Sequence, residues 1–407
     1  MSVLFIADVS VTTPISGSEQ VLYTQANGLV KSKLNVFALT RRNGTSTDIE
    51  YSDSENLKIG CYGADVNNKI LFFISLFQNA QRAFDQFSSK TSFSVSISHQ
   101  PFTCFALLAK KRLTTIPLVY IFHSPNHEEY LLASERKKGV GQFVASWLRK
   151  AIEGYCLKKS AKIVVLSKYM KQKVIDIHGI ADEKIIVNPG GVDLDRFHPL
   201  EKRALIKEEL ELPTDRLHLL TVRNLEPRMG LDNLIRAIYL LREKGSPVHL
   251  TIGGEGPERK LLDHIISAYG LRNDISLTGF IPAERLSQYY AAADFFILPT
   301  RELEGFGLVT IESMACGTPV LGTPVGATTE ILSNFDSRFL FKNATPEAMA
   351  AGIQSSIVNI WSNPYAYNDL RERCRDYVKK KYSWQKHIMQ LKSIMMEVTA
   401  GASIKSN

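Results

Sequence analysis

The chain alternates short, uninterrupted apolar runs with longer segments of helical periodicity, and this alternation restarts half-way along its 407 residues. Uninterrupted apolar runs are typical of strands buried on both faces, as in a parallel sheet covered by helices. The expected strands are Val3–Ala7, Val36–Leu39, Phe93–Ile97, Leu118–Phe122 and Ile163–Leu166, then His218–Thr221, Val248–Ile252, Ile275–Thr278, Phe295–Leu298 and Val320–Gly322. Helices are expected between them, over Glu19–Val30, Ile70–Phe87, Gly141–Lys158, Leu231–Lys244 and Pro257–Tyr269.

A segment rich in proline, glycine and aspartate, Asn188–Pro199, separates the two sets of strands. We therefore predict two doubly wound α/β domains joined by a linker near residues 188–213. Ligands of such sheets bind outside the carboxyl ends of the strands. The expected site is a cleft between two facing domains.

Composition excludes several other classes of protein. Hydrophobic residues make up 44% and charged residues 22% of the chain, which excludes global disorder and a small disulfide scaffold. The five cysteines are scattered without a Cys-x-x-Cys pair, which favours reduced thiols and opposes a zinc site. The amino-terminal segment lacks the charged and apolar regions of a secretory signal, and the longest uncharged stretch, Thr91–Ala109, is too polar to span a bilayer. We expect a cytoplasmic protein.

Positive charge is concentrated in one part of the first half. Residues 101–175 hold 14 basic and 4 acidic side chains. Such a zone suits an anionic membrane, a phosphorylated substrate or a nucleic acid. Nucleic-acid binding is the weakest of the three because the basic residues lack interleaved aromatics or a known module. The apolar side chains expected to add membrane contact are Phe72, Phe73, Leu76, Phe77 and Phe84, although such a pattern more often faces a core.

The most informative segment is Arg301–Gly317, which follows an expected strand. Gly305 and Gly307 predict a tight loop, and residues 308–315 predict a helix. Glycines between a strand and a helix let backbone N–H groups approach an anion at the helix amino terminus. Glu304 and Glu312 carry carboxylates that can each accept two hydrogen bonds from a vicinal diol of a sugar. The alternative for Glu312 is that it caps a loop or pairs with a basic neighbour.

This segment, EGFGLVTIESMACGTPV, resembles the signature of the family-four retaining glycosyltransferases, which have the GT-B fold. Four other segments are similar to that family: Ile163–Pro199, the turn Gly253–Pro257, the pair Ala293–Asp294 and the segment Tyr382–Trp384. The resemblance covers nearly the whole chain. It implies an acceptor-binding domain over residues 1–195, a nucleotide-sugar-binding domain over 196–380, and a helical segment over 381–407 that crosses back to the first domain.

The resemblance also implies roles for individual residues. Glu304 would contact the donor sugar and Glu312 the ribose. Backbone groups around Gly305, Phe306, Gly307 and Leu308 would meet the sugar or the diphosphate. The other residues implied in donor binding are Gly254 and Glu255 of the second-domain turn, and Gly17 and Ser18 of the loop after the first strand. A helix cap by Ser16 or Ser18 is the structural alternative for that first loop.

This chain departs in one place from the diphosphate-binding pattern of the family. The family has Gly-Arg-Leu-x-x-x-Lys-Gly, and Arg223 stands at the arginine, but Met229 stands where the lysine is expected. Arg228 precedes it and is predicted to supply the second cation, since a guanidinium suits bidentate contact with phosphate. A solvated charge at a helix start is the alternative for Arg228. The lost lysine keeps open a non-catalytic sugar-nucleotide binder or scaffold subunit.

His123 ends an expected strand, and the family carries a histidine near this position that approaches the reacting sugar. Alone, such a histidine is more often structural. His127 lies four residues further on, but Pro125 opposes the helix that an H-x3-H metal pair needs. Asp193 and Asp195 form a D-x-D match that we assign to turn chemistry in the linker. We expect no metal.

The expected function is retaining transfer of a hexose from a nucleotide-diphosphate sugar, with UDP-hexose favoured, to a sugar or lipid-linked acceptor in the synthesis of cell-surface polysaccharide or glycolipid. No other cofactor is implied. Peripheral contact with an anionic membrane is expected through residues 101–175. A nicotinamide dehydrogenase is disfavoured because Arg259 replaces the third glycine of the dinucleotide fingerprint. A glycosidase that uses Glu304 and Glu312 is opposed by the glycine loop and by the two sets of strands.

Overall fold

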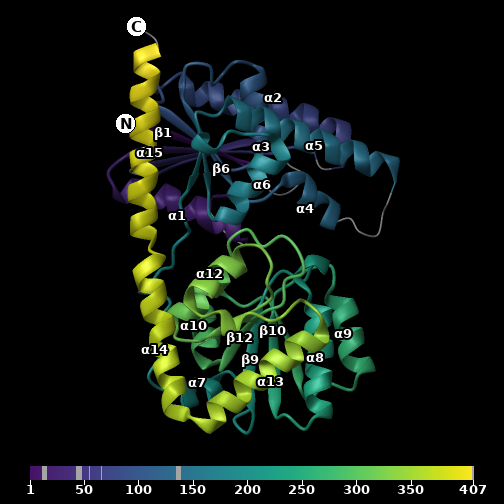
Figure 1. Ribbon diagram of the computed structural model, residues 1–407. Helices are drawn as coiled ribbons and strands as arrows, with labels where there is room; N and C mark the ends of the chain where they lie inside the picture. The colour runs from purple at the N-terminus through teal and green to yellow at the C-terminus, as the bar shows by residue number, and fades with distance from the viewer. Residues whose placement is uncertain (12–15, 43–47, 55, 66, 134–138, 406–407) are drawn as a thin grey trace. The chain divides into compact units, whose positions relative to one another are not determined.

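The computed structural model of the protein describes residues 1–11, 16–42, 48–54, 56–65, 67–133 and 139–405. Its contacts divide the chain into two compact units. The first unit holds Met1–Gly190 and Trp384–Asn407, and the second unit holds Gly191–Ser383. Each unit has its own sheet and its own core (Figure 1).

The first unit is built on a sheet with the strand order β3-β4-β2-β1-β5-β6-β7-β8. Its strands are β1 (Ser2–Ala7), β2 (Asn35–Arg41), β3 (Ile49–Ser54), β4 (Leu57–Tyr62), β5 (Val95–Ser98), β6 (Leu118–Phe122), β7 (Lys162–Val165) and β8 (Ile185–Val187). The pairs are parallel apart from the antiparallel pair of β3 and β4. The predicted doubly wound parallel architecture is confirmed.

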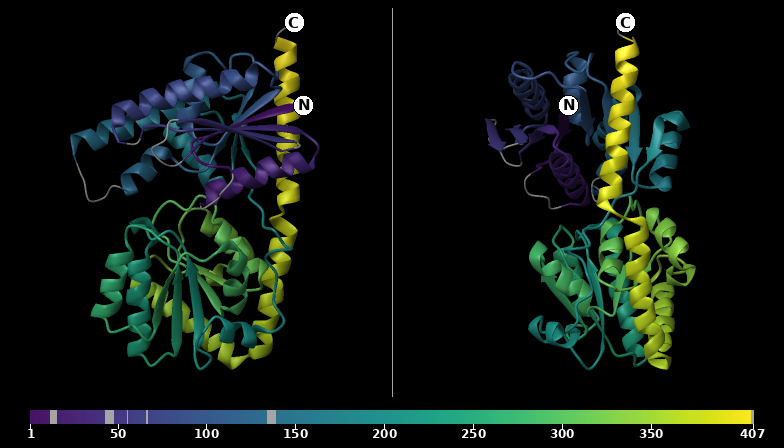
Figure 2. Two further views of the ribbon diagram at one scale, coloured as in Figure 1. Left: turned by 180° about the vertical axis from the view of Figure 1, so that it is seen from behind. Right: turned by 90° about the vertical axis from the view of Figure 1, so that its left-hand side faces the viewer.

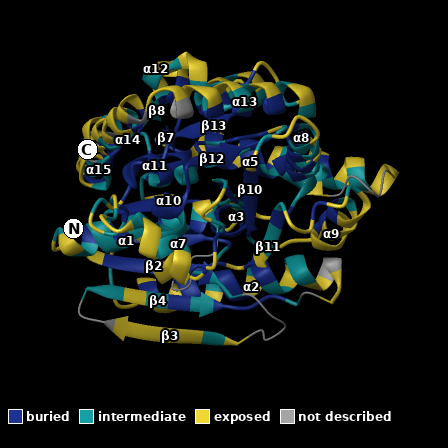
Figure 3. Ribbon diagram, turned by 90° about the horizontal axis from the view of Figure 1, so that it is seen from below, coloured by how far each residue is buried: buried dark blue, intermediate teal, exposed yellow. Residues whose placement is uncertain are grey.

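Three strands of this sheet were not predicted: β3, β4 and β8. Strand β3 is largely exposed at the sheet edge, whereas β2 in the interior is largely buried (Figure 3). Strand β4 alternates polar and apolar residues. Strands β3 and β4 lack the continuous apolar run that identifies the inner strands, whereas β8 at the other edge is apolar but only 3 residues long.

Helices cover both faces of the first sheet. They are α1 (Gly17–Lys31), α2 (Lys69–Ser88), α3 (Pro101–Ala109), α4 (Asn126–Ala133), α5 (Val140–Lys159), α6 (Lys168–His178) and α15 (Trp384–Lys405). Although α15 is the last helix of the chain, it packs beside α1 in the first unit (Figure 2). A Cβ on Gly28 of α1 would lie 2.7 Å from Ile388 of α15, so the missing side chain permits this approach.

The apolar side chains of α2 that were expected at a membrane are buried or half-buried. Leu76 and Phe84 are buried in the unit, and Phe77 packs edge-to-face on Phe105 of α3. Phe72 and Phe73 are half-buried. Leu76 and Phe84 therefore supply core packing, as the alternative interpretation of this helical pattern expects. Membrane contact by Phe72, Phe73 and Phe77 stays a prediction.

The second unit has a five-stranded parallel sheet with the order β11-β10-β9-β12-β13. Its strands are β9 (Leu217–Val222), β10 (Val248–Gly253), β11 (Ile275–Gly279), β12 (Phe295–Leu298) and β13 (Val320–Gly322). Its helices are α7 (Arg203–Glu209), α8 (Leu231–Glu243), α9 (Arg259–Ala268), α10 (Ala283–Ala292), α11 (Leu308–Ala315), α12 (Ala327–Phe335), α13 (Pro346–Ser362) and α14 (Pro364–Lys381). All five predicted strands are present. No helix among the described residues is long and apolar enough to cross a membrane.

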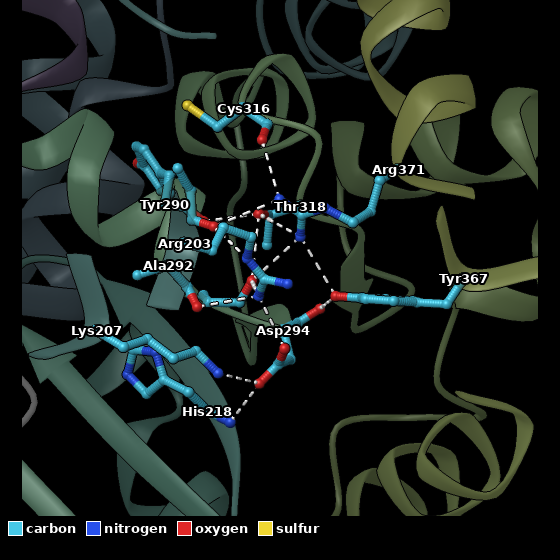
Figure 4. Close-up of polar contacts among 12 residues, drawn as sticks. Arg203, Lys207, His218, Tyr290, Ala292, Asp294, Cys316, Thr318, Tyr367 and Arg371 are labelled. Carbon is cyan, nitrogen blue, oxygen red and sulfur yellow. Dashed lines mark hydrogen bonds and ion pairs between the residues drawn. The ribbon is translucent and has the colours of Figure 1, made fainter. Parts of the chain in front are cut away.

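Asp294 anchors the amino end of β12 (Figure 4). Its carboxylate accepts hydrogen bonds from Arg203 at 2.8 Å, from Lys207 at 3.0 Å and from the backbone N–H of His218 at 2.8 Å. Burial alone would raise the pKa of Asp294, but the Arg203 and Lys207 cations bring it below its ordinary value. This charge cluster fixes α7 and β9 against β12 at the end of the sheet opposite the carboxyl edge. It therefore serves the fold.

Buried neutral histidines predict acid sensitivity. Burial lowers the pKa of seven imidazoles, and the shift is large for five of them: His99, His123, His178, His218 and His387. Below the unfolded value of about 6.5 the unfolded chain binds protons that the folded chain cannot, so stability is lost as the pH falls. Each such histidine adds a slope of up to roughly 1.4 kcal/mol per pH unit.

Urea unfolding between pH 7 and pH 5 measures this slope. We expect the free energy of unfolding to fall steadily over that range. Replacing His218, whose pKa is lowered to about 3, by Asn should reduce the slope. A stability that stays constant from pH 7 to pH 5 would contradict the expectation.

Candidate functional site

The carboxyl ends of β9 and β12 bring two predicted residues together in the second unit. Arg223 follows β9 by one residue, and Glu304 lies in the loop between β12 and α11. The two strands are direct neighbours in the sheet, so the side chains that follow them meet at one edge. The guanidinium Nη2 of Arg223 lies 2.7 Å from Oε2 of Glu304, and both side chains are more than nine-tenths buried.

This ion pair is only partly satisfied. The hydroxyl of Thr300 donates to the same Oε2 of Glu304 at 3.0 Å. The second guanidinium nitrogen of Arg223, Nη1, is buried and has no hydrogen-bond partner among the described residues. An unpartnered N–H of a buried cation costs free energy unless an acceptor reaches it. Nη1 of Arg223 can therefore donate a hydrogen bond to an anionic oxygen of a ligand.

Met229 occupies the place where the family has its lysine, and the structure shows what the thioether does there. It is buried, and Nη2 of Arg223 donates to its sulfur at 2.9 Å. A thioether is only a weak acceptor. Met229 therefore leaves the guanidinium with Glu304 as its single charged partner, and it adds no cation to the site.

Arg228 lies on the short helix Pro227–Met229 and reaches the same loop by another route. Its Nη1 donates to the carbonyl of Leu303 at 2.9 Å, and its Nε donates to Glu226 at 3.2 Å. Leu303 is in the left-handed region, with φ of 59°, which is strained for a leucine. Arg228 thus holds the strained residue directly before Glu304.

Close backbone approach explains the glycines near this site. Gly254 has φ of 126°, and a Cβ there would lie 1.9 Å from the carbonyl oxygen of Arg223. The turn after β10 packs directly on the backbone that carries Arg223, which donates its N–H to Gly253 at 2.9 Å. Glu255 of the same turn is exposed. The role of Gly254 and Glu255 in donor binding stays a prediction.

Gly326 was not found by sequence reasoning. Its φ is 57°, and a Cβ there would lie 2.3 Å from the carbonyl oxygen of Glu304. The next residue, Ala327, donates its N–H to that oxygen at 3.0 Å. The loop before α12 therefore packs against the backbone of Glu304 and holds its carbonyl group by a hydrogen bond. Its only sequence signal was a glycine after a strand.

The glycine loop and helix α11 form where the sequence predicts them. Gly307 has φ of 80° and starts α11, which spans Leu308–Ala315 as expected. Phe306 is buried and packs edge-to-face on Tyr382. Gly305 and Leu308 are half-buried. The amino terminus of α11 directly follows the loop that holds Glu304, and the first N–H groups of a helix suit an anion.

Glu312 lies within α11, eight residues after Glu304. Its Oε2 accepts a hydrogen bond from the hydroxyl of Tyr290 at 3.0 Å. Burial raises the pKa of Glu312, while the Tyr290 hydrogen bond opposes that shift. Its partner is thus a phenol rather than a basic neighbour. Its second carboxylate oxygen has the capacity for a diol.

Two residues predicted to take part in donor binding, Gly17 and Ser18, lie in the first unit. Gly17 and Ser18 form the first turn of α1, and residues 12–15 of the preceding loop lie outside the described residues. Ser16 caps that helix, with Glu19 completing a capping box. Of the two serines considered as a cap, Ser16 takes that role, and a role of Gly17 and Ser18 in donor binding stays a prediction.

His123 directly follows β6, and its Nε2 lies 3.0 Å from Nδ1 of His99, which directly follows β5. Burial lowers the pKa of His123 to about 4. The imidazole is therefore neutral at pH 7. Its neighbour His99 was not found by sequence reasoning, although its place after a strand was a usable signal.

Among the described residues, no group of three His, Cys, Asp or Glu side chains is arranged to hold a metal ion. Asp193 receives the backbone N–H groups of Asp195 and Arg196 at 3.0 and 3.1 Å. This is the turn chemistry expected of the D-x-D segment.

Two family models match most of the chain. Residues 202–381 match the model described as glycosyl transferases group 1, and residues 15–196 match the model described as Glycosyltransferase Family 4. The chain belongs to the family-four glycosyltransferases. Its fold is GT-B, with two Rossmann-like halves.

Curated relatives of this glycosyltransferase share parts of the chain. A GDP-mannose-dependent α-(1-6)-phosphatidylinositol monomannoside mannosyltransferase of Mycolicibacterium smegmatis is 38% identical over 149 residues, which are 35% of this chain and 39% of that protein. A D-inositol 3-phosphate glycosyltransferase of Streptosporangium roseum is 29% identical over 253 residues, which are 60% of this chain and 56% of that protein. The matched segments thus span about half of the lengths of these relatives.

Solved structures share the fold over the whole length. The sucrose-phosphate synthase of Thermosynechococcus elongatus has a TM-score of 0.82 and 20% identity, and the match covers 98% of this chain and 100% of that one. Alr3699/HepE of Anabaena, solved in complex with UDP, has a TM-score of 0.73 and 16% identity, with 98% and 100% covered.

The close packing of Gly254 on the backbone of Arg223 predicts how a methyl group added at Gly254 changes the stability of the second unit. Gly254→Ala places a Cβ against the carbonyl of Arg223, so we expect it to destabilise the second unit by about 3 kcal/mol or more. Gly245→Ala is the matched control because Gly245 also has a positive φ, of 72°, but open space around it. That variant should lose only about 1 kcal/mol. Equal losses in chemical denaturation would show that the close approach to Arg223 is not constrained.

Proposed function

We propose that this glycosyltransferase transfers a hexose from a nucleoside diphosphate sugar to a hydroxyl group of its acceptor. The observation that supports the proposal is the buried guanidinium of Arg223, which is paired on one side with Glu304 and unpartnered on the other. A diphosphate oxygen would satisfy the free N–H and place the attached sugar beside Glu304. Membership of the family-four glycosyltransferases supports the same reaction class.

The reaction breaks the bond between the anomeric carbon and the diphosphate oxygen and forms a bond from that carbon to the acceptor oxygen. Negative charge grows on the diphosphate as the bond breaks, and its stabilisation lowers the barrier. In this proposal Arg223 and the amino terminus of α11 receive that charge. The proton of the acceptor hydroxyl passes to the departing phosphate.

We propose that the transfer retains the anomeric configuration by attack on the same face. Glu304 is held by Arg223 and by the hydroxyl of Thr300, and this pairing lowers its value as a nucleophile. Its proposed role is to accept hydrogen bonds from the sugar hydroxyls, while Glu312 accepts those of the ribose. His123 is a neutral hydrogen-bond partner for a sugar hydroxyl.

The proposed donor is a UDP-hexose, and GDP-mannose, which the name of the Mycolicibacterium relative gives as its donor, is the competing nucleotide sugar. The proposed acceptor is a sugar or a lipid-linked sugar, in the synthesis of cell-surface polysaccharide or glycolipid. The relative that acts on a phosphatidylinositol monomannoside supports a lipid-linked class.

A second candidate function is a non-catalytic subunit that binds a sugar nucleotide. Met229 favours it, because a thioether replaces the second cation of the family pattern and instead contacts Arg223. Binding of a nucleotide without turnover would support this candidate.

Calorimetric titration with UDP, GDP and ADP, followed by hydrolysis and transfer assays with the matching sugar nucleotides, tests the proposal. We expect one nucleotide to bind, and Arg223→Lys to lower kcat by about 10²-fold because a lysine keeps the charge but loses the second donor. Arg216→Lys is the control, since Arg216 precedes β9 and pairs with Asp274 at the opposite end of the same strand. Failure of all three nucleotides to bind would overturn the proposal.

We further propose that α5 is the surface that meets an anionic membrane. One face of α5 exposes an apolar stripe with helical spacing, formed by Val140, Phe143, Val144, Trp147 and Leu148, whose exposed fractions run from 42% to 81%. Exposed apolar groups of this extent mark interaction surfaces. The helix also exposes Lys150, Lys158 and Lys159. An apolar stripe with flanking lysines suits the interface of an anionic bilayer.

Co-sedimentation with vesicles of phosphatidylglycerol and phosphatidylcholine tests this surface. We expect Phe143→Asp combined with Trp147→Asp to reduce bound protein at least tenfold, since both side chains are 68% exposed on the stripe. Tyr365→Asp is the control, because Tyr365 is 87% exposed in the second unit. Binding that survives the double substitution would locate the membrane contact elsewhere.

A further inference from the structure

A chain of side-chain hydrogen bonds runs through the interior of the first unit and ends at His123. It joins residues that lie far apart in the sequence: His123 after β6, His99 after β5, Gln25 in α1 and His387 in α15. The distances are 3.0 Å from His123 to His99, 3.1 Å from His99 to Gln25 and 2.8 Å from Gln25 to His387. Gln25, His99 and His387 are at most 2% exposed.

The backbone at Pro189 sets the direction of the chain. Nδ1 of His387 lies 2.9 Å from the carbonyl oxygen of Pro189. A carbonyl can only accept, so this nitrogen of His387 carries the proton. Burial lowers the pKa of His387 to about 4, so the ring is neutral at pH 7 and its Nε2 is an acceptor.

Each following link is then determined. Nε2 of His387 accepts, so Gln25 must present its amide N–H to it and its amide oxygen to His99. Nε2 of His99 therefore donates to Gln25. Burial lowers the pKa of His99 well below its ordinary value, so this ring is neutral too and its Nδ1 accepts from Nε2 of His123.

We infer that Gln25, His99 and His387 are positioning residues that hold His123 as its Nε2–H tautomer and leave its Nδ1 as a hydrogen-bond acceptor. Nδ1 of His123 has no partner among the described residues, whereas both ring nitrogens of His99 and His387 are engaged. Nδ1 of His123 would accept a hydrogen bond from a sugar hydroxyl, and this part of the inference rests on the proposed function.

Another buried histidine of the chain shows that complete pairing is not a general result of burial. His218 in the second unit pairs through Nε2, and its Nδ1 is buried without a hydrogen-bond partner among the described residues. His99 and His387 in the first unit are instead paired at both nitrogens. A purely structural core would be served as well by apolar side chains, without the cost of burying three polar groups.

Nitrogen-15 spectroscopy of histidine-labelled full-length protein at pH 7 measures the tautomer of each ring directly. We expect His123 to be protonated at Nε2 and unprotonated at Nδ1, with its signals assigned by their loss in His123→Asn. In Gln25→Met, which removes both central hydrogen bonds at similar volume, the two tautomers of His123 should mix. Asn79→Leu is the control, because Asn79 is a buried amide of α2 in the same unit that donates to the carbonyl of Gly63. That variant should leave His123 unchanged.

A second variant keeps the test decisive if Gln25→Met does not fold. Gln25→Glu is nearly isosteric and still accepts from His99, but it has no N–H for His387. We expect His387 to gain a proton at Nε2 while His123 keeps its tautomer. The inference is overturned if His123 in the unmodified protein is protonated at Nδ1, or if folded Gln25→Met has an unchanged His123.

Kinetics separate this inference from the proposed function. With an active transferase, Gln25→Met should lower kcat by about tenfold and leave the KM for the donor unchanged, since the chain aligns His123 and does not touch the donor. A protein that shows the expected tautomers but transfers no sugar would refute the proposed function and leave the positioning chain in place. A kcat equal to that of the Asn79→Leu control would refute the catalytic part of the inference.

Discussion

The ion pair between Arg223 and Glu304 is the constraint on which the second unit depends most. A buried cation or carboxylate alone would cost several kcal/mol, so each requires the other. Their meeting depends on the sheet, since β9 and β12 are neighbours, Arg223 directly follows β9, and Glu304 lies in the loop after β12. It depends equally on small residues, because the turn at Gly254 lies against the backbone of Arg223, and Gly326 lies against that of Glu304. Glycine at these two positions is thus a consequence of placing two charges inside one edge of a sheet.

Elements with a local sequence pattern could be predicted from the sequence, whereas features that depend on long-range contacts could not. Strand Phe295–Leu298 and helix Leu308–Ala315 have the predicted bounds, because an apolar run, a pair of glycines and a helical segment each leave a local signal. The hairpin β3–β4 was missed because its exposed face has no apolar run. Helical spacing alone does not tell which surface covers the apolar residues of α2: Leu76 and Phe84 are buried in the unit, whereas Phe72, Phe73 and Phe77 are half-buried.

The candidate residues also fall into two groups: those that stand in local motifs and those that meet only through long-range contacts. Arg223, Glu304 and Glu312 stand in short motifs, and sequence reasoning found them. Gln25 and His387 are 362 positions apart and become partners only because α15 packs on α1. No window of sequence contains both, and a glutamine in a helix gives no sign of its partner. The carboxyl-terminal helix therefore contributes a polar side chain to the interior of the first unit in addition to the apolar residues of its core.

Met229 shows how one departure from a family pattern changes the chemistry of a site. With a lysine there, two cations would face the diphosphate, whereas the thioether leaves the buried pair of Arg223 and Glu304 formally neutral. The remaining positive potential then comes from the unpartnered N–H of Arg223 and from the amino terminus of α11. Arg228 binds the carbonyl of Leu303 through one of its guanidinium nitrogens, and its role as the second cation stays a prediction. It acts on the loop, where it holds a residue of positive φ one position before Glu304. In this chain Arg228 supports the loop that carries the carboxylate, and in the proposed reaction Arg223 is the buried cation that meets the phosphate.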